Sequence, residues 1–113
     1  MRYMILIYAE EAGWSRLTPE QQAAGMAAYN AYGDKLRQAG AFVESSRLAP
    51  VAKSRQISFA GDKPRVVDGP YADTKEQLGG FYYIEAKNDE EAIRWASECP
   101  GARFGRVELR PVF

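Results

Sequence analysis

The chain opens with a run of seven apolar residues that leaves neither face of a strand polar. In an extended strand, successive side chains point to opposite faces of the sheet. Residues 3–9 therefore place large apolar side chains on both faces, Tyr3, Ile5 and Ile7 on one and Met4, Leu6 and Tyr8 on the other. The segment 81–84, Phe-Tyr-Tyr-Ile, is equally bulky on both faces. Strands of this kind are typical of sheets that are covered on both sides.

Two helices are marked by capping boxes, in which a polar residue precedes the helix and a Glu or Gln follows it by three positions. The first box is Thr-Pro-Glu-Gln at 18–21, with proline at the first helical position, and it predicts a helix over 19–39. The second is Asn-Asp-Glu-Glu at 88–91, and it predicts a helix over 89–99. Pro-Gly at 100–101 should end this second helix.

The remaining segments rich in apolar, β-branched and aromatic residues predict five further strands, at 41–48, 55–60, 65–67, 81–86 and 103–112. The second and third of these form a hairpin, with Gly-Asp-Lys at 61–63 as its turn. The order predicts an α+β fold, a ferredoxin-like split βαβ arrangement with an antiparallel sheet and an inserted hairpin. A length of 113 residues suits one domain, 1–113.

Two helices can cover only one face of such a sheet, so the other face needs a cover. Each Leu or Ile left in water forfeits about 1.5–3 kcal/mol. Three or four such residues would rival a total stability of roughly 5–15 kcal/mol. Because two-fold homodimers are the commonest oligomers, we expect a homodimer in which a second copy supplies the cover. The alternative is that residues 50–67 fold back across the open face.

The composition argues against several classes of function. Fifteen basic residues balance fifteen acidic ones, which removes the electrostatic case for nucleic acid or an anionic membrane. The first apolar run is too short for a signal peptide or a membrane helix, and the lone Cys99 favours a cytoplasmic location. Without histidine or a dinucleotide fingerprint, we expect no metal site and no cofactor.

The most specific motif runs from Asp68 to Tyr82: Asp-Gly-Pro-Tyr at 68–71, then Thr-Lys-Glu-Gln-Leu-Gly-Gly-Phe-Tyr at 74–82. It resembles the signature of the DGPF-type YCII-related family, with Tyr71 in place of phenylalanine. The first strand and the segment 99–112 resemble the same family. The resemblance implies the dimeric α+β barrel superfamily, in which two ferredoxin-like sheets pack face to face.

The same resemblance carries two functional implications. In the wider YCII group, a histidine and an aspartate are thought to form a catalytic dyad. This sequence contains no histidine, and Cys99 stands where that group has an aspartate before proline. Some relatives are also linked to extracytoplasmic-function sigma factors, which implies a non-catalytic partner module linked to sigma-factor regulation.

The loop from 68 to 80 is the candidate site. Asp68 and Glu76 are candidate general bases or ligand anchors, because positioned carboxylates accept protons and hydrogen bonds. Tyr71 lies in the same loop, and Tyr8 and Tyr82 are candidate pocket residues, since tyrosine combines an apolar ring with a polar tip. Alternatively, the loop is a rigid connection whose polar groups satisfy one another.

Several arginines on or beside the predicted strands, Arg106 among them, could bind an anion. Their spread along the chain instead favours solvated edges or pairs with Glu44, Glu85 and Glu108.

Three functional hypotheses therefore stand beside one another. The first is a small-molecule binding protein, or a cofactor-independent enzyme of the α+β barrel type, with a pocket between the sheet and the first helix. The second is the partner module linked to sigma-factor regulation. The third is a structural dimer without a working site.

Overall fold

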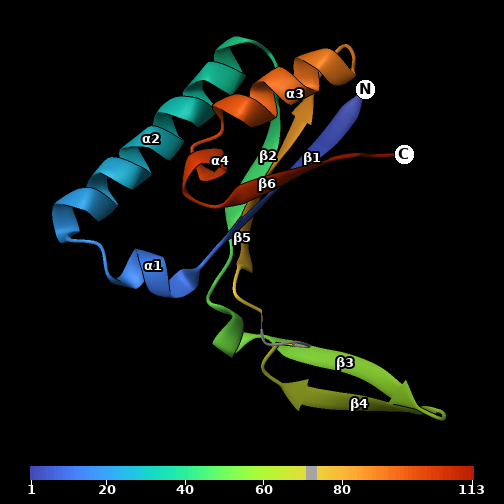
Figure 1. The fold of residues 1–113 in the computed structure, drawn as a ribbon. Coiled ribbons are helices and arrows are strands. Elements are labelled where there is room, and N and C mark those ends of the chain that lie inside the picture. Colours follow the sequence, from blue (N-terminus) through green and yellow to red (C-terminus); the bar gives the residue numbers. More distant parts are fainter. Residues whose placement is uncertain (71–73) are drawn as a thin grey trace.

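The computed structural model describes residues 1–70 and 74–113, and its main body is a four-stranded sheet with helices on one face (Figure 1). The strand order is β2-β5-β1-β6, so β1 (Arg2–Ala9) and β5 (Gln77–Glu85) are central. The edges are β2 (Phe42–Arg47) and β6 (Arg106–Pro111), and every pairing is antiparallel. The α+β fold with a ferredoxin-like split βαβ sheet is thus confirmed.

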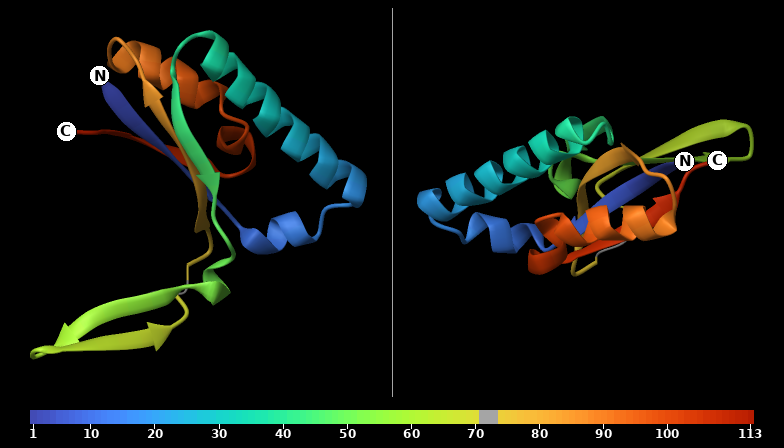
Figure 2. Two further views of the ribbon diagram at one scale, coloured as in Figure 1. Left: turned by 180° about the vertical axis from the view of Figure 1, so that it is seen from behind. Right: turned by 90° about the horizontal axis from the view of Figure 1, so that it is seen from above.

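The two long helices, α2 (Pro19–Gln38) and α3 (Asp89–Glu98), lie on the same side of this sheet (Figure 2). Both begin where their capping residues predict. The Thr18 hydroxyl accepts a hydrogen bond from the backbone N–H of Gln21, and the Asn88 side chain accepts one from the N–H of Glu91. No helix among the described residues is both long enough and apolar enough to cross a bilayer.

Two short helices were not predicted. The first is a single helical turn, α1 (Glu11–Ser15). A second turn, α4 (Gly101–Phe104), occupies the start of the strand expected over 103–112, so β6 begins only at Arg106. Just before β6, a Cβ at Gly105 would lie 2.2 Å from the backbone oxygen of Tyr8, so this close approach to β1 requires glycine.

The strand expected over 81–86 also begins four residues early, at Gln77. The Gly-Gly pair at 79–80 looks like a break in the sequence. In the structure, Gly80 lies inside the sheet, where a Cβ would be 2.8 Å from the backbone oxygen of Ser46 on β2. The glycine therefore permits a close approach of two strands.

The space between the sheet and the helices is filled by a single hydrophobic core. Its largest fully buried members, less than 2% exposed, are Tyr3, Ile5, Leu36, Ile84 and Cys99. Aromatic rings close the core beside α2, because the ring of Tyr82 meets that of Tyr32 edge-on, with 5.0 Å between centroids.

Burial raises the pKa of the Cys99 thiol from its ordinary 9.0 to about 11. The unfolded chain therefore loses this proton at a lower pH than the folded chain does. Below pH 9 both states keep the proton, and between about pH 9 and 11 the free energy of unfolding should fall. Tyrosines of the same core add to this fall at higher pH, since burial raises the pKa of Tyr82 to about 12.

Replacing Cys99 with alanine isolates the contribution of the thiol. We expect urea unfolding of Cys99→Ala to show a shallower loss of stability between pH 9 and 11 than the unmodified chain. The absolute stability at pH 7 serves as the reference for each protein. Equal slopes in the two proteins would show that the thiol is not buried as described.

The predicted hairpin exists, and it forms a separate two-stranded sheet made of β3 (Arg55–Ala60) and β4 (Lys63–Asp68). Its turn is shorter than expected, Gly61-Asp62, since Ala60 pairs with Lys63. This hairpin, here called the arm (residues 55–68), projects from the end of the main sheet (Figure 1). The alternative that residues 50–67 fold back across the sheet is therefore wrong.

The face of the main sheet opposite the helices is here called the open face. Its large apolar and aromatic side chains include Met4, Leu6, Tyr8, Phe81 and Tyr83, and all five are half-buried. Charged residues of β6 border them on one side, because Leu6 pairs with Glu108 and Met4 with Arg110. In the single chain, no described helix covers this face.

Candidate functional site

A cavity of about 620 Å³ opens where β1 ends and β5 and β6 begin, beside the base of the arm. Its volume lies within the range of about 300–1,000 Å³ that is usual for small-molecule sites. The described residues of its wall are Tyr8, Val51, Pro70, Thr74, Lys75, Glu76, Gln77, Leu78 and Arg106. Polar and apolar groups thus meet in one concave surface.

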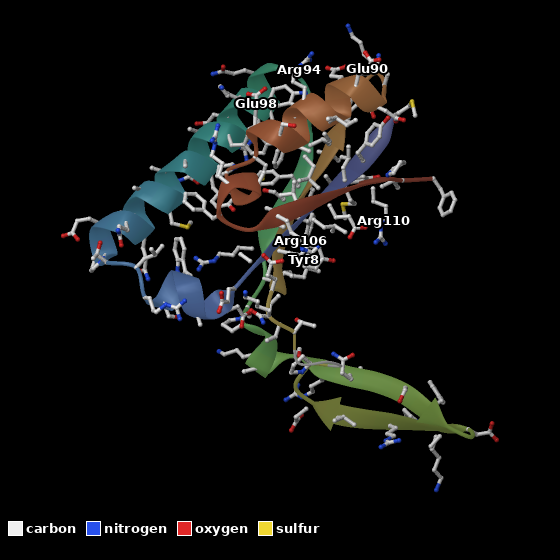
Figure 3. The ribbon with its side chains drawn as sticks, viewed as in Figure 1. Tyr8, Glu90, Arg94, Glu98, Arg106 and Arg110 are labelled. Atoms are coloured by element: carbon white, nitrogen blue, oxygen red, sulfur yellow. The ribbon has the colours of Figure 1, made fainter. Side chains whose placement is uncertain are left out.

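Three side chains of this cavity form a layered cluster. The guanidinium carbon of Arg106 lies 4.7 Å from the centroid of the Tyr8 ring, and Figure 3 shows these two side chains close together. The Nε of Arg106 also lies 2.7 Å from Oε1 of Glu76, in a charge-assisted hydrogen bond. The cluster presents cationic, anionic and aromatic groups together.

The elements around the cluster explain its geometry. Tyr8 and Arg106 are direct partners in the β1–β6 pairing, which brings the two side chains onto the same face. On its other side, β1 has an irregular register with β5 between Ile7 and Tyr8, so Tyr8 pairs with Leu78. Irregularities of this type are frequent beside functional sites, where they redirect a side chain.

The described part of the candidate loop is fixed by its own hydrogen bonds. The hydroxyl of Thr74 donates to the backbone oxygen of Glu76 at 2.7 Å. The side-chain oxygen of Gln77 accepts from the backbone N–H of Glu11 at 2.9 Å, which ties the loop to α1. The described residues 74–77 thus carry both these hydrogen bonds and part of the cavity wall.

The predicted site residues separate into groups. Tyr8 and Glu76 both line the cavity. Asp68 does not; it lies at the end of β4 with its side chain 91% exposed, and its carboxylate is 3.4 Å from Nε of Arg55. It borders a smaller hollow formed with residues 52–55. Tyr71 lies outside the described residues.

Tyr82 lies on the opposite face of the sheet from Tyr8. It is 7% exposed, and its hydroxyl donates to the backbone oxygen of Tyr29 at 3.2 Å. The pocket was expected between the sheet and the first long helix. That space is filled by the rings of Tyr29, Tyr32 and Tyr82, and the cavity lies instead at the end of the sheet.

Arg106 is the cavity residue that sequence reasoning assigned to a solvated edge. Its partner Glu76 lies thirty residues earlier, so no local spacing connects them. A signal for Arg106 was the order of the elements: in the predicted fold, the strand after the second helix pairs with the first strand, which contains Tyr8. Among the described residues, no cluster of three or more Cys, Asp or Glu side chains could hold a metal ion.

Comparison with known proteins places the chain. A family model described as the YCII-related domain matches residues 1–113. The chain is 32% identical over 114 residues to an uncharacterised protein of Rhizobium meliloti, R00369, and the match covers 99% of this chain and 92% of that protein.

Among solved structures, the fold is similar to the 5-chloro-2-hydroxyhydroquinone dehydrochlorinase of Burkholderia phenoliruptrix in complex with 2,5-dihydroxybenzoquinone. The TM-score is 0.57 over 100% of this chain and 94% of that chain. With 15% sequence identity, this likeness concerns the fold alone.

Proposed function

The chain belongs to the YCII-related family, and from this premise we propose that it is a homodimeric small-molecule-binding protein. Its ligand site is the cavity around Tyr8, Glu76 and Arg106. The observation that carries this proposal is the position of Arg106, held between an aromatic ring and a carboxylate at the wall of that cavity.

The groups on the cavity wall indicate a class of ligand. Nε of Arg106 is engaged with Glu76, while its terminal N–H groups have no hydrogen-bond acceptor among the described residues. A guanidinium recognises planar oxygen-bearing groups, and Glu76 can accept a hydrogen bond from a hydroxyl. The ligand is therefore a small planar molecule with both carbonyl and hydroxyl oxygens.

The fold likeness is consistent with this class. The solved relative is a dehydrochlorinase that holds 2,5-dihydroxybenzoquinone, a planar ring with carbonyl and hydroxyl groups. This similarity also favours a second candidate function, a cofactor-independent enzyme in which Glu76 acts as general base toward a ligand hydroxyl. Turnover of a halogenated hydroquinone that disappears in Glu76→Gln would support this second candidate.

The homodimer rests on the open face. Leu6 and Phe81 lie side by side there, at the centre of a sheet that the helices cover from the other side only. A second copy placed face to face would remove these side chains from water, which is favourable by about 25 cal/mol per Å² of apolar surface.

The ligand site can be tested by calorimetric titration with 2,5-dihydroxybenzoquinone. We expect the unmodified chain to bind this probe and Arg106→Leu to bind it about tenfold or more weakly. The reason is that a hydrogen bond to a charged group contributes about 1.5–3 kcal/mol.

The control is Arg94→Leu, which removes an arginine from α3, far from Tyr8 and Arg106 in Figure 3. This variant should bind like the unmodified chain. Equal affinities of all three proteins, or no binding by the unmodified chain, would contradict the assignment of this ligand class to the cavity.

A further inference from the structure

One face of the arm carries four largely exposed apolar side chains, with the Arg55–Asp68 ion pair at its base. In the β3–β4 pairing, Ile57 lies opposite Val66 and Phe59 opposite Pro64, so these four side chains share one face. The exposed fractions are 68% for Ile57, 69% for Phe59 and 57% for Val66. The other face carries Gln56, Ser58, Lys63 and Arg65, together with Ala60 and Val67.

The arm has little support from its own chain. Neither of its strands pairs with the four-stranded sheet. An isolated two-stranded hairpin is at best marginally stable in water, and exposed apolar strands are an aggregation liability. A contiguous exposed apolar surface usually marks a contact site. The apolar face of the arm is therefore expected to contact another protein surface.

The direction of the arm indicates which surface it contacts. Figures 1 and 2 show the arm leaving the end of the main sheet and pointing away from the layer formed by α2 and α3. Strands of six residues, at about 3.4 Å per residue, make the arm about 20 Å long. A second copy seated on the open face would lie within this reach. Under two-fold symmetry, each arm would reach the other copy.

The size of the open face also favours contact between the arm and a second copy. Four strands about 4.8 Å apart and about 20 Å long give about 400 Å² of flat area. A standard interface buries about 800 Å² of accessible surface on each partner, which exceeds the flat area of the open face. One face of an arm adds about 200 Å² to its own copy and covers as much of the partner. The two arms thus double the flat area available for contact between the copies.

We propose that the apolar face of the arm docks onto a second copy of this chain. The dimer is then held by two exchanged arms as well as by the paired open faces. This inference rests on the homodimer of the proposed function, and it adds a second, separable contact to that dimer.

Two adjacent valines give a matched test. Val66 is on the apolar face of the arm and Val67 on the other face, and their exposures in the single chain are 57% and 47%. Dimer dissociation constants would be measured by sedimentation equilibrium for Val66→Asp and Val67→Asp. We expect Val66→Asp to weaken the dimer about tenfold or more, because its carboxylate would be desolvated, and Val67→Asp to change it less than about twofold.

The remaining outcomes distinguish failure of the arm contact from failure of the homodimer. Circular dichroism should show both variants folded, since the arm does not pair with the main sheet. If both variants dimerise like the unmodified chain, or both are weakened equally, the arm does not dock in this way, while the homodimer stands. An unmodified chain that remains monomeric would remove the homodimer itself, and the docking of the arm with it.

Discussion

A Leu6→Glu variant should be monomeric at protein concentrations at which the unmodified chain is dimeric. Leu6 lies at the centre of the open face, between Phe81 of β5 and Glu108 of β6. In a single chain the new carboxylate can reach water. In a face-to-face dimer it would be buried beside another acidic residue, and an uncompensated buried charge costs several kcal/mol. A loss of about 3 kcal/mol weakens the dimer more than about 100-fold.

The measurement is a dilution series by sedimentation velocity. Leu6→Met serves as control, because exchanging similar apolar volumes usually costs less than about 1.5 kcal/mol. This control should retain most of the dimer affinity, and both variants should keep the circular dichroism of the parent. An unchanged dissociation constant for Leu6→Glu would place the dimer contact elsewhere on the molecule.

Leu36→Ala should reduce the free energy of unfolding by about 2–5 kcal/mol. Leu36 is 0% exposed and lies on α2, where it packs into the single core between helices and sheet. Truncation removes apolar contacts and leaves a cavity that the neighbours fill only in part. Because the total stability of a domain this size is roughly 5–15 kcal/mol, the loss is a large fraction of it.

Urea unfolding at a fixed protein concentration measures this loss, because dimerisation makes stability depend on concentration. Leu48→Ala is the matched control, since Leu48 is 41% exposed just after β2. Its cost should be under about 1 kcal/mol. Equal costs at the two positions would mean that α2 does not pack on the sheet as described.

The sequence was sufficient for features that depend on local patterns. The capping residues Thr18 and Asn88 place both long helices, because their side chains bond to backbone groups three residues away. The unbroken apolar run in β1 places large apolar side chains on both faces of the sheet, as the structure shows. These signals lie within single elements, where spacing alone determines which groups meet.

The candidate site is formed by contacts between residues far apart in the sequence, which local patterns do not predict. Both faces of the segment 81–84 are bulky, so the sequence did not show that Tyr82 shares its face with Ile5 and is buried in the core. Arg106 reaches Tyr8 and Glu76 only through the pairing of β6 with β1. Strand register decides these contacts, and register is a property of the assembled sheet.

The direction of the arm was also not predictable from local sequence. The strand patterns of residues 55–60 and 65–67 predict a hairpin, and the structure has one. The direction of the hairpin relative to the main sheet is not specified by the pattern of its own strands. A hairpin folded over the open face and a projecting arm have the same strand pattern, so the sequence left both open.

The homodimer, and with it the docking of the arm, requires that a second copy covers the open face. Sedimentation equilibrium of the unmodified chain at micromolar concentration tests this most directly. We predict a species of twice the 12.6 kDa mass of the single chain. A species of 12.6 kDa across the whole concentration range would contradict the account, because the apolar open face would then stand in water.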